Sequence, residues 1–152
     1  MFGREEEKRV LLSLLESEKS EFVAIYGRRR VGKTYLVRET YNYNFAFQHT
    51  GLQDATIREQ LEEFANSLTI AGMKKVKRPK NWSQAFFMLG QHLSTLPEGK
   101  KVVFIDELPW LDARNSKFVS ALDHFWNGWA TARKDIVLVV CGSATSWIMD
   151  KI

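Results

Sequence analysis

The sequence lacks several features that would place it in a special class of protein. It has one cysteine, Cys141, so no internal disulfide can form, as is typical of a reducing, cytoplasmic setting. No run approaches the roughly 20 apolar residues of a membrane span, and residues 1–7 contain no apolar signal core. Repeats, low-complexity tracts and Pro/Gly/Ser linkers are also missing. We therefore expect one cytoplasmic domain over residues 1–152 with no membrane partner.

The charge of the chain is mildly basic. Its 152 residues carry a formal net charge of +4 and have a pI near 9.2. Such a balance favours phosphate ligands and nucleic acid. Residues 72–80 form a lysine-rich loop that is suited to contact with nucleic acid. More often, a run of charges of this kind is a solvent-exposed loop. His49, His92 and His124 are scattered, and no spacing of His, Cys and Asp indicates zinc.

Short apolar runs alternate with segments of helical periodicity. The predicted strands cover 21–26, 45–49, 101–105 and 136–141. The predicted helices cover 5–18, 33–40, about 56–70, 81 or 83 to before Pro97, and 116–133, and a last helix opens near Thr145. This order predicts an α/β fold, a parallel sheet with helices on both faces. Each strand ends in polar or glycine residues, so we expect a ligand site at the carboxyl edge of the sheet.

The strongest motif is Gly27–Thr34, with the sequence GRRRVGKT, between a predicted strand and a predicted helix. It matches the phosphate-binding pattern GxxxxGK[ST] at every fixed position. The glycines let the backbone fold around phosphate oxygens, Lys33 supplies a point charge, and the Thr34 hydroxyl is suited to Mg²⁺. The predicted ATP-binding residues are Gly27, Arg28, Arg29, Arg30, Val31, Gly32, Lys33, Thr34 and Tyr35. The three arginines are suited to add charge at the phosphates or to face a partner subunit, and solvated side chains are an equally good explanation.

Two carboxylates form the second motif. The run Val102–Ile105 delivers Asp106 and Glu107 to the end of a strand. We expect Asp106 to hold Mg²⁺ together with Thr34, and Glu107 to polarise the attacking water. Because the phosphate motif is present in the same chain, these roles explain the acidic pair better than two solvated carboxylates at a strand end do.

Smaller features leave alternatives open. Ser143 follows the last strand, where it is suited either to contact the γ-phosphate or water or to cap the next helix. Trp126 and Trp129 are three residues apart on a helix, which favours core packing over base stacking. For Trp110 both core packing and a role at the ligand site stay open, because it follows the acidic pair closely in sequence.

GRRRVGKT, VVFIDELPWL and VVCGSA, in this order, resemble prokaryotic AAA+-type P-loop ATPases, in particular the archaeal and bacterial group near the STAND branch. The resemblance implies Mg²⁺-dependent ATP binding and hydrolysis, with Lys33 and Thr34 as the Walker A pair and Asp106 and Glu107 as the Walker B pair. It places Ser143 at the sensor 1 position, where asparagine or threonine is commoner. It also matches Gly3 and Arg4 to an entry motif that packs near adenine.

The resemblance further implies that the chain is an N-terminal fragment without the fifth strand and the helical lid. Catalytic residues would then be Glu107, Lys33 and Ser143, with slow turnover because no arginine finger is evident. The alternatives are a nucleotide-dependent binding or self-association module that does not hydrolyse ATP, and a DNA-associated protein. Expected partners are nucleotide, a second copy of the chain and an effector domain.

Overall fold

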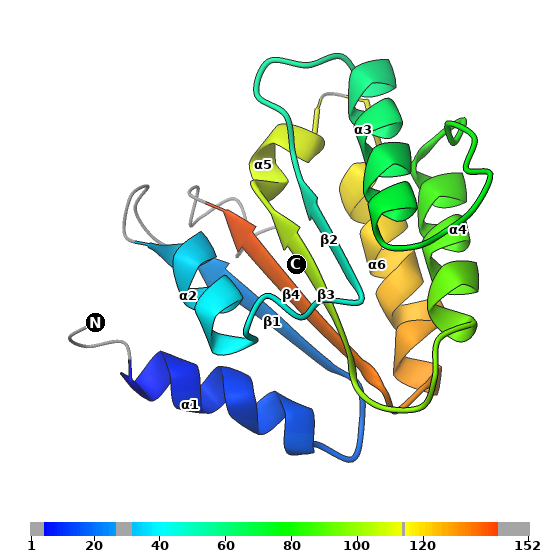
Figure 1. Cartoon of the computed structure of the whole chain (residues 1–152). Coiled ribbons are helices and arrows are strands. Elements are labelled where there is room, and N and C mark those ends of the chain that lie inside the picture. Colours follow the sequence, from blue (N-terminus) through cyan, green and yellow to red (C-terminus); the bar gives the residue numbers. More distant parts are fainter. Residues whose placement is uncertain (1–4, 27–31, 114, 143–152) are drawn as a thin grey trace.

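The computed structural model describes residues 5–26, 32–113 and 115–142, and within them it shows alternating helices and strands (Figure 1). The elements in chain order are α1 (Glu5–Ser13), η1 (Leu14–Glu16), β1 (Glu21–Tyr26), α2 (Lys33–Thr40), β2 (Phe47–Thr50), α3 (Ile57–Ile70), α4 (Trp82–Ser94), β3 (Lys101–Asp106), α5 (Leu108–Leu111), α6 (Phe118–Gly128), η2 (Ala130–Ala132) and β4 (Ile136–Gly142). The predicted α/β class is confirmed.

The described strands form one sheet in the order β1-β4-β3-β2, and every neighbouring pair is parallel. The register aligns the carboxyl ends of the strands. Tyr26 lies opposite Gly142, and Thr50 lies opposite Asp106. The expectation that the polar strand ends meet at one edge is therefore confirmed.

Helices cover both faces of this sheet, as Figure 1 shows. The alternation of side chains along the central strands explains the two layers. On β3, Val103 and Ile105 pack under α3, α4 and α6, whereas Val102 and Phe104 pack under α1 and α2. β3 and β4 are buried along their whole lengths, which accounts for their nearly uninterrupted apolar sequences.

The helix starts follow the capping signals of the sequence. Thr56 and Glu59 form a reciprocal capping box at the start of α3. The Asn81 side chain accepts a hydrogen bond from the backbone N–H of Gln84 at the start of α4. None of the helices in the described ranges is long and apolar enough to cross a bilayer.

Some predicted boundaries were wrong. The first helix ends at Ser13 and continues only as a 3-10 turn, and β2 begins at Phe47 instead of Phe45. The helix predicted over 116–133 is split, because Lys117 has a left-handed conformation before α6 and Trp129 leaves helical geometry after it. The helix predicted from Thr145 lies outside the described residues.

His49 is a core residue of β2 and is 2% exposed. Its Nδ1 lies 2.8 Å from Ser67 Oγ, and its ring lies edge-on to Phe64 at 5.0 Å. Burial disfavours the charged imidazolium and lowers the pKa of His49 from 6.5 to about 4. The histidine is therefore neutral in the folded protein at physiological pH.

This burial predicts a loss of stability in mild acid. Below pH 6.5 the unfolded chain takes up a proton on His49 that the folded protein does not bind until about pH 4. The free energy of unfolding should therefore fall over this window, by an amount on the order of 3 kcal/mol. Urea denaturation at pH 7.5, 5.5 and 4.5 measures the slope. His49→Phe should make the free energy of unfolding less dependent on pH, whereas His124→Gln, at an exposed position, should leave the pH dependence unchanged. Equal pH dependence in the two variants would show that His49 is not its cause.

Candidate phosphate-binding site

The start of α2 lies directly after the edge of the sheet where the strands end. Gly32 precedes the helix with φ 77°, a left-handed conformation that glycine adopts without strain. Its carbonyl accepts the N–H of Leu36 and so closes the first turn of α2. The first amides of a helix have no partner within the helix and present partial positive charge. This end of α2 is suited to an anion such as phosphate.

Thr34 and Asp106 are joined across this edge. The Thr34 hydroxyl donates a hydrogen bond to Asp106 Oδ2 at 2.5 Å, although the two residues are 72 positions apart. The other oxygen, Oδ1, accepts the backbone N–H of Glu107 at 2.9 Å. Asp106 is 4% exposed, so these bonds hold a buried carboxylate in one orientation. The sequence predicted this pair from motifs in different thirds of the chain.

The Thr34 and Asp106 oxygens fit Mg²⁺ by their chemistry. A hydroxyl and a carboxylate are oxygen donors of the kind that Mg²⁺ prefers, and this ion commonly binds one or two protein groups together with substrate phosphates and water. Within residues 5–26, 32–113 and 115–142, no three His, Cys, Asp or Glu side chains gather into a cage for a metal.

The charges of three groups from the two motifs act on the thiol of Cys141. Burial raises the pKa of this thiol, the charges of Asp106 and Glu107 raise it further, and the charge of Lys33 lowers it. Cys141 itself is fully buried on β4 and belongs to the core under α1 and α2. It is a protonated packing group that lies within electrostatic reach of Lys33 and of both carboxylates.

Glu107 leaves β3 in a left-handed conformation, with φ 56° and ψ 44°. It is only partly buried, and the short helix α5 begins immediately after it. Trp110, on α5, donates its indole N–H to Glu107 Oε2 at 2.9 Å. Sequence reasoning predicted neither α5 nor this contact, although Pro109 is typical of the first turn of a helix.

Several predicted site residues lie outside the described residues. They are Gly3, Arg4, Gly27, Arg28, Arg29, Arg30, Val31 and Ser143. Tyr35 is described, and its side chain is 50% exposed in the first turn of α2. Of the predicted set, hydrogen bonds join Thr34, Asp106 and Glu107, and Gly32 and Lys33 lie at the start of the helix that carries Thr34.

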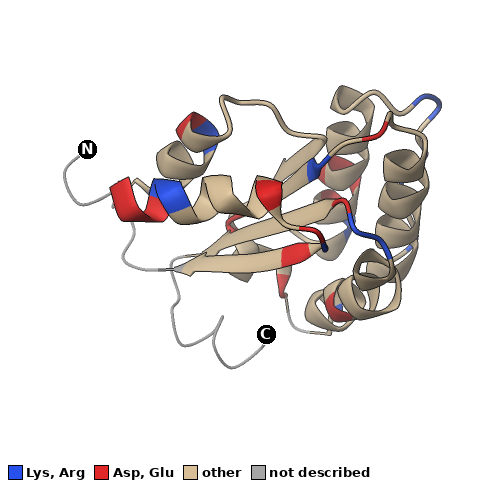
Figure 2. Ribbon diagram, turned by 90° about the horizontal axis from the view of Figure 1, so that it is seen from below, with Lys and Arg blue, Asp and Glu red and all other residues tan. Residues whose placement is uncertain are grey.

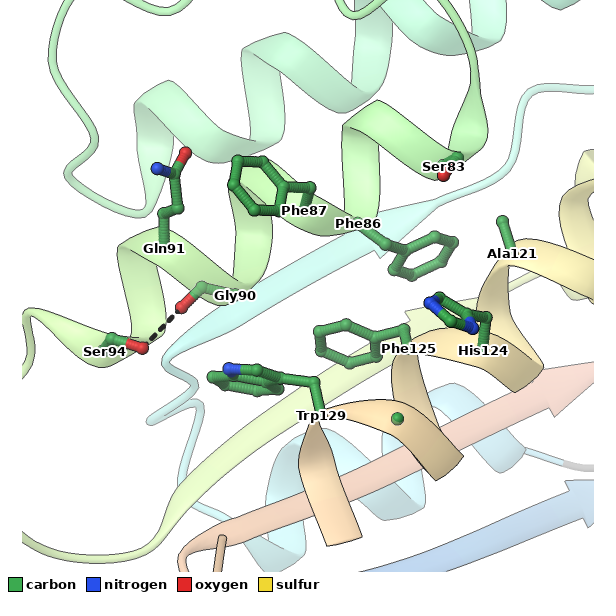
Figure 3. A pocket seen from close by; sticks show the side chains of 11 residues that line it. Ser83, Phe86, Phe87, Gly90, Gln91, Ser94, Ala121, His124, Phe125 and Trp129 are labelled. Carbon is green, nitrogen blue, oxygen red and sulfur yellow. Dashed lines mark hydrogen bonds between the residues drawn. The ribbon is translucent and has the colours of Figure 1, made fainter. Parts of the chain in front are cut away.

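The apolar hollow in Figure 3 is separate from this site. It measures about 280 Å³ and is lined by one side of α4 and the facing side of α6, extended by Trp129. Phe86 and Phe125 contribute aromatic surface to it, and Phe87 beside them is 64% exposed. All of its lining residues come from these helices and Trp129, so it cannot receive a phosphate held at the strand ends.

The lysine-rich loop between α3 and α4 is partly neutralised by the protein itself. Arg78 forms an ion pair with Glu62 at 3.2 Å, and Glu62 also pairs with Arg58. In Figure 2, basic and acidic segments alternate over the molecule. This distribution favours the interpretation of the loop as a solvated surface.

The fold and the site define a class of protein. A parallel sheet in this strand order, a glycine-led helix after β1 and a β3 carboxylate bonded to the threonine of that helix are the parts of a P-loop nucleotide-binding domain. The sequence matches, over residues 1–152, the family described as an ATPase domain predominantly from Archaea. The chain belongs to this family, and nucleotide binding is the function its family implies.

Similar proteins support the fold. An uncharacterized protein of Methanocaldococcus jannaschii is 26% identical over 151 residues, which are 98% of this chain and 31% of that protein. The Walker-type ATPase of Pyrococcus abyssi superposes with a TM-score of 0.64 at 19% identity, over 99% of this chain and 48% of that one. Cdc6p of Pyrobaculum aerophilum gives 0.63 at 18% identity, over 98% and 41%. The ORC2 protein of Aeropyrum pernix, solved as ADPNP and ADP complexes, gives 0.60 at 16% identity, over 100% and 44%. The chain thus spans less than half the length of each of these proteins.

Proposed function

We propose that the chain binds Mg²⁺-ATP at the start of α2 and hydrolyses it slowly. The observation that carries this proposal is the hydrogen bond from Thr34 to Asp106, which joins the two motifs at the carboxyl edge of the sheet. Lys33 and Glu107 both lie within electrostatic reach of Cys141. Membership in the ATPase family supports the choice of nucleotide.

Each residue has a distinct role in this proposal. The amides that follow Gly32 and the Lys33 ammonium bind the β- and γ-phosphates. Thr34 and Asp106 hold Mg²⁺, which when bound neutralises charge on the phosphate oxygens. Glu107 accepts a proton from the attacking water, and Ser143 contacts the γ-phosphate. The arginines of the phosphate loop add positive charge, and Gly3 and Arg4 lie near the base.

The wider role proposed is that of a nucleotide-driven switch coupled to an effector domain or to a second copy of the chain. Among the described strands, β1 pairs on one side only, with β4, which suits the other side to a further strand. A binding module without turnover remains the second candidate. Kinship with the STAND branch, a cytoplasmic location and contact with DNA stay predictions.

The test of the proposed function is calorimetric titration of the chain with ATP, in Mg²⁺ and in excess EDTA. We expect saturable binding of one nucleotide per chain with a micromolar Kd in Mg²⁺. Removal of Mg²⁺ should weaken it by about tenfold or more, because the Thr34 and Asp106 oxygens then lose the ion that links them to phosphate. No binding to a folded chain, shown by circular dichroism, would overturn the proposal.

A further inference from the structure

We infer that Trp110 is a positioning residue for Glu107, an inference that rests on the proposed role of Glu107 as the base. The indole Nε1–H can only donate, so its 2.9 Å contact with Glu107 Oε2 is a hydrogen bond to the carboxylate. The bond engages one of the two carboxylate oxygens. In the proposed role, this bond restricts the rotation of the carboxylate and leaves Oε1 as the oxygen that accepts the proton from water.

The backbone around Glu107 supports this role. Glu107 is one of seven non-glycine residues with positive φ among the described residues, and its left-handed conformation starts the turn from β3 into α5. The turn folds α5 back, and the Trp110 amide donates to the Glu107 carbonyl at 3.1 Å. Trp110 is thus tied to Glu107 by both its backbone and its side chain.

Gln60 holds the backbone of Trp110 by a hydrogen bond to its carbonyl. This side chain, on α3, is 1% exposed. Its Nε2 donates to the Trp110 carbonyl at 3.1 Å and to the Leu52 carbonyl at 2.7 Å, and its Oε1 accepts the Leu52 amide at 3.0 Å. A buried amide used in this way holds α5 and the turn after β2 as one unit.

Gly51 brings that turn into direct contact with Glu107. Its amide donates to the Asp106 carbonyl at 3.0 Å. A β-carbon placed on it would lie 2.6 Å from the Glu107 carbonyl oxygen and 2.9 Å from Leu111 Cγ, closer than real contacts allow. The orientation of Glu107 is therefore determined by three segments: the end of β3, helix α5 and the turn after β2.

The test compares Trp110→Phe, which keeps an aromatic ring and removes the donor, with Trp126→Phe as the matched control. Trp126 packs edge-on against Phe22 at 5.2 Å and has no role in the proposed site. Under single-turnover conditions, Trp110→Phe should lower the rate of ATP hydrolysis at least about tenfold while the Kd for Mg²⁺-ATP stays within about threefold. In a Glu107→Gln background, Trp110→Phe should cause no further loss, because nothing remains to be positioned.

A second measurement tests the contact itself without relying on turnover. The chain has five tryptophans and hence five indole N–H resonances in a ¹⁵N-correlated spectrum. In Glu107→Ala, the Trp110 resonance should move upfield and exchange faster with D₂O, because its acceptor is gone. This spectrum does not depend on how well Trp110→Phe folds.

The outcomes separate the two proposals. If the unsubstituted chain shows no hydrolysis that depends on Glu107, the proposed catalytic role fails, and the positioning role fails with it. If that hydrolysis is present, three results each overturn the positioning role alone. The first is a hydrolysis rate of Trp110→Phe that is no lower than that of Trp126→Phe. The second is a further loss of rate when Trp110→Phe is added to Glu107→Gln. The third is an indole resonance of Trp110 that does not change in Glu107→Ala.

Discussion

Replacing Lys33 by alanine should abolish Mg²⁺-ATP binding. Lys33 is the first residue of α2 and one of the charges that act on Cys141, so it lies at the proposed phosphate position. Hydrogen bonds to charged groups contribute about 1.5–3 kcal/mol each, and the ammonium is expected to contact more than one phosphate. We therefore expect the Kd measured by calorimetry to rise about 100-fold or beyond detection.

The matched control for this variant is Lys77→Ala. Lys77 is exposed in the loop between α3 and α4, and its substitution removes the same charge. Its Kd should stay within about twofold of the unsubstituted chain. Unchanged affinity in Lys33→Ala, with the folded state verified by circular dichroism, would show that the nucleotide does not bind at the start of α2.

Glu107→Gln should preserve Mg²⁺-ATP binding and reduce the rate of hydrolysis strongly. The amide keeps the shape of the side chain and can still accept the Trp110 hydrogen bond, but it cannot take a proton from water. General-base catalysis contributes about 10²–10⁴-fold, so a single-turnover rate with radiolabelled ATP should fall by about that factor. The Kd should stay within about threefold.

Glu98→Gln, at an exposed position after α4, serves as the control and should hydrolyse ATP at the unsubstituted rate. A Glu107→Gln protein that still releases phosphate at the original rate would exclude Glu107 as the base. If the unsubstituted chain binds ATP but shows no phosphate release dependent on Glu107, the binding module becomes the better description.

The motifs and the sheet could be predicted because their signals are local. The apolar strand 101–106 is buried on both faces, and Thr56 and Asn81 cap helices with their own side chains. Parallel strands then require that the ends of β3 and β4 meet the start of α2. Signals between neighbours in sequence therefore predict that Thr34 lies close to Asp106, and the hydrogen bond between them agrees.

The surroundings of Glu107 could not be predicted, because they depend on contacts between distant segments. Gln60 has no motif that would distinguish it from a surface glutamine on α3, and its role appears only when α5 and Leu52 are packed beside it. Helix α5 is a single short turn, so its periodicity gives no signal. The early start predicted for β2 has a similar cause, since Phe45 packs against Phe104 without pairing as a strand residue.

The strand order has a consequence for synthesis of the chain. β1 is made first, but its partner in the sheet is β4, and the Ile136 amide bonded to Ser20 Oγ is 116 residues further along. At a synthesis rate of about 5–20 residues per second, β1 waits on the order of ten seconds for that partner. A ribosome-bound chain that stops before β4 therefore carries Lys33 and Thr34 without the sheet that holds them beside Asp106. If ATP binds where we propose, its site therefore forms late in synthesis, only after β4 has left the ribosome and paired with β1.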